Sequence, residues 1–173
     1  MEPQEQAKRP KTALAGPYGH PLHPSLVAVP IGAWIASLVF DIASHAVHDP
    51  RFLAEGSRWL IGLGVLGALA AALFGFLDLL AIPRQTRAFR TALVHMGINL
   101  AVTAAYAVGF FVRAGHTAGP VPAGPLALSA VALAALAVSG YLGGELAYRY
   151  GVRVADERTQ ASGFATTGRG GDR

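Results

Sequence analysis

Two histidines, each followed directly by a proline, stand in the hexapeptide Gly-His-Pro-Leu-His-Pro at residues 19–24. Imidazole readily binds metal ions and haem iron, and it exchanges a proton near neutral pH. A residue that precedes a proline is biased toward an extended conformation. We therefore expect His20 and His23 to lie on a stiff extended arm, with Pro24 in the first turn of the helix that follows.

Further groups that could take part in chemistry lie inside long apolar stretches of the chain. They are Asp41, His45, Asp78, His95, Asn99 and Glu145. An ionisable side chain inside a membrane is costly, so each ionisable member of this set needs a partner or a role.

Four apolar segments position these groups. Of the 173 residues, 53% are hydrophobic and 14% are charged, whereas soluble domains carry about 25% charged residues. Each segment can cross a hydrocarbon core of about 30 Å as a helix, so the sequence predicts an all-α integral membrane protein, a multi-pass four-helix bundle. The predicted parts are a disordered basic leader (1–18), a transmembrane domain (19–149) with spans at about 24–47, 59–82, 91–112 and 125–148, and a flexible cytoplasmic tail (150–173).

Basic residues are distributed unevenly around the spans. The leader, the second loop and residues 149–173 after the fourth span carry eleven of the 14 Lys and Arg residues. Because basic residues favour cytoplasmic loops, both termini are predicted to be cytoplasmic. The same distribution explains the net charge of +4 by membrane topology, and no nucleic-acid partner is predicted. The chain has no cysteine, which excludes disulfides, thiolate metal sites and cysteine-ligated iron–sulfur clusters within it.

This topology brings several polar groups to one depth, about one helical turn from the cytoplasmic boundary. The groups at this depth are Asp78, His95 and Glu145 in the spans, with His20 and His23 on the arm, and Asn99 lies one turn further into the third span. Near the opposite boundary, Asp41 and His45 are four residues apart on one helix face and are expected to satisfy each other.

Four interpretations of the inner cluster stay open. In the first, His23 and His95 are the two axial ligands of a haem b. In the second, His20, His23 and His95 bind a metal ion, with Asp78 or Glu145 completing the site. In the third, the buried groups form a polar lock that only fixes the helices. In the fourth, Asp78, His95 and Glu145 handle protons or ions.

Several motifs stand along the chain. They are Gly-His-Pro-Leu-His-Pro-Ser-Leu-Val-Ala-Val-Pro-Ile-Gly at 19–32, Gly75-x-x-Asp78, Ile82-Pro83, His95-x-x-x-Asn99, Ser-Gly-Tyr-Leu-Gly-Gly-Glu-Leu at 139–146 and Tyr-Arg-Tyr-Gly at 148–151. Together these motifs resemble a bacterial membrane family known as domain of unknown function 2231. The resemblance covers about residues 19–154 and implies four spans, a bacterial cytoplasmic membrane and no established activity. Some relatives carry a Rieske-type iron–sulfur domain, which implies electron transfer with a partner protein; this chain has no cysteine to ligate such a cluster.

Motifs of stand-alone enzymes are missing from the sequence: there is no nucleophile elbow, phosphate-binding loop or metalloprotease helix. We expect a haem-binding or redox-linked membrane subunit in the lipid bilayer. The alternatives are a structural or partner-binding membrane protein and a small proton- or ion-handling protein. Small residues at four-residue spacing, such as Ala135, Ser139 and Gly143, predict close helix packing within the bundle or in a homo-oligomer.

Overall fold

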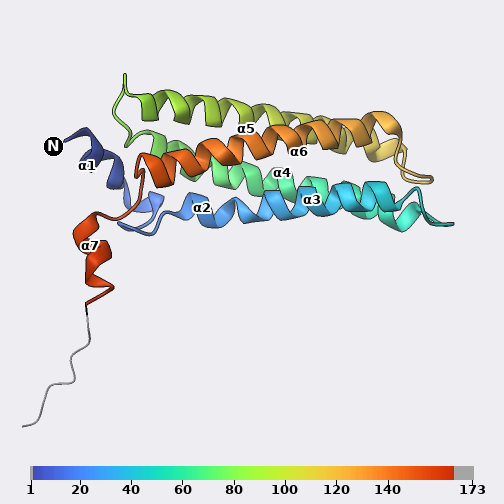
Figure 1. The fold of residues 1–173 in the computed structure, drawn as a ribbon. Helices are drawn as coiled ribbons and strands as arrows, with labels where there is room; N and C mark the ends of the chain where they lie inside the picture. Colours follow the sequence, from blue (N-terminus) through green and yellow to red (C-terminus); the bar gives the residue numbers. More distant parts are fainter. Residues whose placement is uncertain (1, 166–173) are drawn as a thin grey trace, which may run out of the picture.

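The computed structural model describes residues 2–165, and within them the chain is helical, with no strand. Four long helical segments, which we call rods, run antiparallel to their neighbours. They lie side by side (Figure 1). They are α2 (Leu22–Leu26) continued by α3 (Ala28–Ala43), then α4 (Arg51–Leu79), α5 (Arg87–Val112) with the 3-10 turn η2 (Arg113–Gly115), and α6 (Ala123–Gly144) with the π-helical turn η3 (Glu145–Arg149). All four are long and apolar enough to cross a membrane, so the prediction of a helical chain with four candidate membrane spans is confirmed for the described residues.

The rods follow one another around the bundle. α3 packs against α4 and α6, and α5 packs against the same two helices, so α3 and α5 lie on opposite corners. Both ends of the described chain lie at one end of the bundle, where α1 (Pro3–Lys8) and α7 (Glu157–Ser162) are found (Figure 1). We call this the termini end, and we call the opposite end, with the loops around 44–50 and 116–122, the distal end.

The middle of the bundle is held by aromatic stacking. The rings of Trp34 and Tyr106 stack with centroids 4.2 Å apart and planes 9° apart, and Ile61, Val102 and Ala132 complete the buried core. Large apolar side chains elsewhere point outward; Leu66, for example, is 68% exposed. Since lipid is as apolar as these side chains, close packing and interhelical hydrogen bonds must hold the helices together.

Gly64 on α4 lies directly under the indole of Trp34, which leaves no room for a Cβ atom. We expect Gly64→Ala to lower the free energy of unfolding by about 1–3 kcal/mol, because the overpacked indole must move. Gly97→Ala is the matched control, since a Cβ there meets nothing within 4 Å and alanine is the better helix former. Denaturant unfolding in detergent micelles measures both variants. A Gly64→Ala protein as stable as Gly97→Ala would contradict the packing described here.

The segment around His23 differs from the expected extended arm. Pro21 is the N-cap of α2, so His23 and Pro24 lie in the first helical turn. The backbone N–H groups of a first turn have no partner within the helix, and a proline there loses no hydrogen bond. The helix is interrupted at Val27, between α2 and α3. This interruption fits the expected effect of Pro30, which has no N–H to donate to the carbonyl four residues earlier.

The predicted leader and the described part of the predicted tail contain helical turns and buried side chains, and residues 166–173 of that tail lie outside the described residues. Residues 2–18 contain α1 and the 3-10 turn η1 (Ala13–Ala15), and the side chains of Ala7 and Ala15 are buried. In the described part of the tail, Arg153 is 3% exposed. Contacts between these two segments explain their order, and they converge on the site described next.

Candidate functional site

His23 lies on α2 and its imidazole is fixed against α4. The Nδ1 atom is 2.8 Å from the carbonyl oxygen of Ala71. Because a carbonyl only accepts, Nδ1 carries the hydrogen and Nε2 keeps its lone pair. Gly75 packs against the ring, and a Cβ atom at Gly75 would come within 2.9 Å of Nδ1. The small residue at position 75 is therefore what lets the imidazole reach the α4 backbone.

His95 on α5 repeats this arrangement against α6. Its Nδ1 atom is 2.8 Å from the carbonyl oxygen of Ser139 and 3.0 Å from the hydroxyl of the same residue. The side-chain amide of Asn99 lies 3.1 Å from Nε2, so Nε2 is again the acceptor nitrogen. A Cβ atom at Gly143 would come within 3.2 Å of the ring.

The two imidazoles meet across the interior of the bundle, although their helices occupy opposite corners. Their ring centroids are 6.2 Å apart and the ring planes stand at 86°. His23 and His95, which the sequence predicts to be at the same depth, are thus brought together. Both rings present a nitrogen lone pair, and both are held in place by a bond to a helix carbonyl.

Asp78 is held by an arginine that the sequence interpretation missed. Its Oδ1 atom is 2.7 Å from Nε of Arg153. The Nη2 group of Arg153 donates to the carbonyls of Ala15 (2.8 Å) and Gly16 (3.1 Å). The backbone N–H of Arg153 donates to the carbonyl of Ala7 (3.0 Å). A carboxylate close to a span end needs a cation, and the arginines just beyond the fourth span were the signal that could have suggested one.

A second contact joins the same terminal segments. The hydroxyl of Tyr18 donates to Oδ2 of Asp156 (3.0 Å) and accepts from the Asp156 backbone N–H (2.7 Å). Asp156 also caps α7 by accepting from the backbone of Thr159. Hydrogen bonds from Thr159, and then from Tyr18, lower the pKa of the Asp156 carboxyl below its ordinary value. The two terminal segments are therefore held at the termini end by the Asp78–Arg153 ion pair and by the Tyr18–Asp156 contact.

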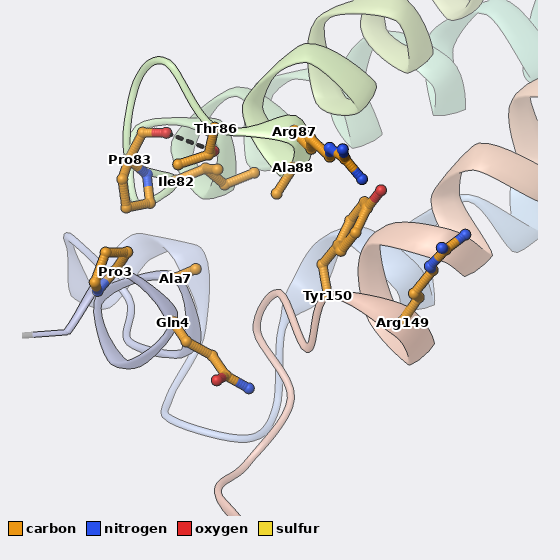
Figure 2. A pocket seen from close by; sticks show the side chains of 10 residues that line it. All are labelled: Pro3, Gln4, Ala7, Ile82, Pro83, Thr86, Arg87, Ala88, Arg149 and Tyr150. Carbon is orange, nitrogen blue, oxygen red and sulfur yellow. Dashed lines mark hydrogen bonds between the residues drawn. The ribbon is translucent and has the colours of Figure 1, made fainter.

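Glu145 and His20 lie apart from the histidine pair. Glu145 accepts from Arg149 (3.0 Å) and from the hydroxyl of Tyr150 (3.2 Å) at the end of α6, where Figure 2 draws Arg149 and Tyr150. His20 is exposed, and its nearest polar contact is the carbonyl of Tyr18 at 3.4 Å. Within residues 2–165 no three His, Cys, Asp or Glu side chains gather closely enough to hold a metal ion. Of the residues considered for a metal ion, His23 and His95 lie together, while His20 is exposed and Glu145 pairs with Arg149.

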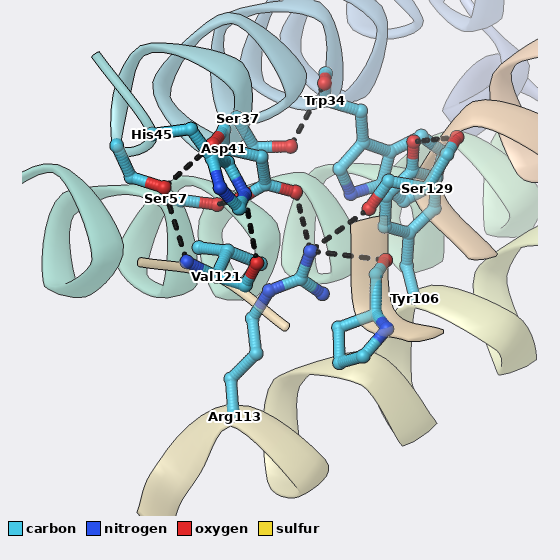
Figure 3. Close-up of polar contacts among 11 residues, drawn as sticks. Trp34, Ser37, Asp41, His45, Ser57, Tyr106, Arg113, Val121 and Ser129 are labelled. Carbon is cyan, nitrogen blue, oxygen red and sulfur yellow. Dashed lines mark hydrogen bonds and ion pairs between the residues drawn. The ribbon is translucent and has the colours of Figure 1, made fainter. Parts of the chain in front are cut away.

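At the distal end, the carboxylate of Asp41 is bound by two side chains from other parts of the chain (Figure 3). It accepts from Arg113 and from the hydroxyl of Ser57, and both Asp41 and Arg113 are at most 2% exposed. Arg113 also donates to the hydroxyl of Ser129 (3.1 Å) and to the carbonyl of Pro125 (3.2 Å). This cluster ties together α3, α4, α6 and the turn that follows α5.

The expected pairing of Asp41 with His45 is wrong. The helix α3 ends at Ala43, so the i, i+4 relation that would place the two side chains on one face does not extend to His45. The Nε2 atom of His45 instead lies 3.0 Å from the carbonyl of Val121 in the distal loop. The polar residues named from the sequence therefore fall into separate groups: His95 with Asn99, Asp78 with Arg153, Glu145 with Arg149, and Asp41 with Arg113.

Comparison with known proteins places the chain in a family. Neither the curated proteins nor the solved structures contain a match to it. A family model described as "Predicted membrane protein (DUF2231)" matches residues 19–156, which include all four spans and both histidines of the pair. The chain belongs to this family of predicted membrane proteins.

Proposed function

We propose that the protein is a haem-binding membrane subunit in which His23 and His95 are the axial ligands of a haem b. The observation that carries the proposal is the pair of imidazoles from opposite corners of the bundle, with centroids 6.2 Å apart. Two imidazole nitrogens that bind one metal ion at about 2 Å each place their ring centroids roughly 6 Å apart. Helix bundles commonly bind cofactors in this way, through side chains on facing helices.

The hydrogen bonds of the pair support the same role. A histidine that binds a metal usually donates its other ring N–H to a carbonyl or carboxylate, which fixes the tautomer and the ring orientation. Both Nδ1 atoms have such a carbonyl partner at 2.8 Å. Both Nε2 atoms are therefore the basic nitrogens that iron requires, with Asn99 as the group that Nε2 of His95 would exchange for the metal. Haem supplies one-electron redox chemistry when it is bound.

The proposed location follows from charge. The termini end is flanked by the leader, the second loop and the segment that starts at Arg149, which together carry eleven of the 14 basic residues. By the tendency of basic residues to stay in the cytoplasm, the histidine pair is on the cytoplasmic side of a bacterial cytoplasmic membrane. In this position a partner protein could exchange electrons with the site across a short distance.

Haem content tests the proposal directly. We expect the protein expressed with excess haem and purified in detergent to hold about one haem per chain. His23→Ala and His95→Ala should lose most of it, because each removes one of two iron ligands. The matched control is His20→Ala, which removes an exposed histidine three residues from His23 in the same motif. A haem-free wild-type protein, or equal haem in all three variants, would contradict the proposal.

A second candidate is a structural polar lock, and the same two bonds favour it. His23 joins α2 to α4 and His95 joins α5 to α6, and rings at 6.2 Å are also in the range of edge contact. For a lock, His95→Ala lowers the stability of haem-free protein by about 1–3 kcal/mol, because buried partners lose their bond. Stability loss without any haem in the wild type would favour the lock. Proton or ion handling is less favoured, since Asp78 and Glu145 are engaged by arginines.

A further inference from the structure

A second site lies at the membrane boundary of the termini end, outside the histidine pair. A pocket of about 370 Å³ is bounded by α1, by the connection between α4 and α5, and by the end of η3. Figure 2 shows residues of α1 facing Ile82 and Pro83, while Arg87 and Tyr150 extend toward one another. The candidate spans end at Leu79 and Arg149 and begin again at Arg87, so the pocket opens where a lipid headgroup layer would lie.

The lining of this pocket combines positive charge with apolar walls. Among the described residues, the charged side chains that line it are Arg87 and Arg149, and none of its lining residues carries a carboxylate. Tyr150, which directly follows Arg149 in the chain, offers a further polar contact through its hydroxyl, while Ile82, Pro83 and Ala88 supply apolar surface. Arginines are the preferred partners of phosphate groups, which they bind through two N–H donors at once. The chemistry therefore fits an anion that carries an apolar body.

A neighbouring hollow provides a place for that apolar body. A second depression, of about 540 Å³, is lined by Tyr141, Gly144, Glu145, Tyr148 and Arg149 along the outer face of α6 and η3. Tyr141 and Tyr148 are 74% and 92% exposed, as is common for aromatic side chains at a membrane interface. Arg149 belongs to both linings, so the basic pocket and the aromatic surface are continuous around it.

The widened end of α6 creates this arrangement. In the π-helical turn the backbone N–H of Tyr150 bonds to the carbonyl of Glu145 at 3.1 Å, five residues earlier. Glu145 then holds both Arg149 (3.0 Å) and the Tyr150 hydroxyl (3.2 Å). Turns of this kind occur often at functional sites. Here the turn fixes Arg149 and Tyr150 in the wall of the pocket that Arg87 also lines.

We propose that this pocket binds the phosphate headgroup of an anionic phospholipid, with the acyl chains lying against the Tyr141–Tyr148 face of α6. Basic pockets between membrane helices are known sites for anionic headgroups. The site would hold a lipid at the end of the bundle where α1 contacts the α4–α5 connection. Bound lipid would thereby join the N-terminal helix to three of the spans.

Native mass spectrometry of the full-length protein, delipidated in a neutral detergent, tests the proposal. Phosphatidylglycerol and phosphatidylcholine are titrated separately, and inorganic phosphate is added as a soluble competitor. We expect phosphatidylglycerol to bind in preference, and Arg87→Gln to weaken its binding by about fivefold. Arg90→Gln is the matched control. Arg90 is exposed, lies one turn further along α5 than Arg87 and does not line the pocket, so its replacement removes the same charge outside the site. Arg87→Lys keeps the charge and should retain more binding than Arg87→Gln.

Three outcomes would overturn the proposal. Equal binding of the two lipids would show that the negative headgroup is not recognised. Equal loss in Arg87→Gln and Arg90→Gln would assign the effect to general surface charge. Displacement of the lipid by millimolar inorganic phosphate would identify the ligand as a soluble anion. None of these results depends on haem, so the lipid site and the haem proposal fail independently.

Discussion

Replacement of Arg113 by methionine is expected to lower the free energy of unfolding by about 3–5 kcal/mol, because it leaves the buried carboxylate of Asp41 without its cation. Asp41 is 0% exposed and Arg113 is 2% exposed. The only remaining side-chain donor seen at Asp41 among the described residues would be the Ser57 hydroxyl. Arg113 also bonds to Ser129 and Pro125, so its loss releases the turn after α5 from α6. Unfolding by denaturant in micelles gives the magnitude.

The double variant separates the ion pair from the packing around it. Asp41→Asn combined with Arg113→Met removes both charges, and we expect it to recover more than half of the stability lost in Arg113→Met. Arg51→Met is the surface control at the same end of the bundle, where the side chain is exposed and the cost should stay within about 0.5 kcal/mol. A double variant less stable than Arg113→Met alone would show that Asp41 does not need neutralisation.

Replacement of Arg153 by alanine should cost about 2–4 kcal/mol, somewhat less than the distal pair because the Asp78 side chain is 12% exposed. Arg153 serves both terminal segments, since it pairs with Asp78 and donates to the carbonyls of Ala15 and Gly16. Its loss should free the N-terminal segment. We expect trypsin to cleave after Lys8 or Lys11 much faster in the variant than in the wild type, whereas Arg158→Ala, at an exposed position, leaves the rate unchanged.

The backbone at Arg153 sharpens this test. Its φ of +62° lies in the left-handed region, which costs a non-glycine residue roughly 1–2 kcal/mol. Arg153→Gly loses the same ion pair but relieves this strain, so it should be about 1 kcal/mol more stable than Arg153→Ala. If the alanine variant keeps the wild-type stability and cleavage rate, Arg153 does not hold the terminal segments.

The features that follow from local pattern could be predicted from the sequence. Runs of apolar residues near the length of a bilayer predict four spans, and the structure has them. The helix repeat and the alternating direction of the spans predict that His95 lies at the depth of His23, and the structure brings the two rings together. These inferences need only periodicity and topology, and neither depends on how the helices are arranged around the bundle.

The features that depend on lateral arrangement could not be predicted. Arg113 follows the third span and Arg153 lies in what reads as a polar tail, and nothing in their spacing assigns them to Asp41 and Asp78. The Asp41–His45 pairing failed because the sequence gives no stop signal at Ala43, where α3 ends. The order of the leader arises from contacts with Arg153 across more than a hundred residues, which composition does not reveal.

The central claim is that His23 and His95 ligate one haem iron, and the optical spectrum of the purified protein in its oxidised and reduced forms tests it most directly. Two imidazole ligands predict a low-spin haem whose Soret band shifts on reduction, and exogenous ligands should bind poorly because both axial positions are taken. The fraction of haem that stays bound in His23→Ala should have one open axial position and the spectrum of a five-coordinate haem. A wild-type protein supplied with haem that has no Soret band, or a spectrum that is unchanged in His23→Ala and in His95→Ala, would contradict the account.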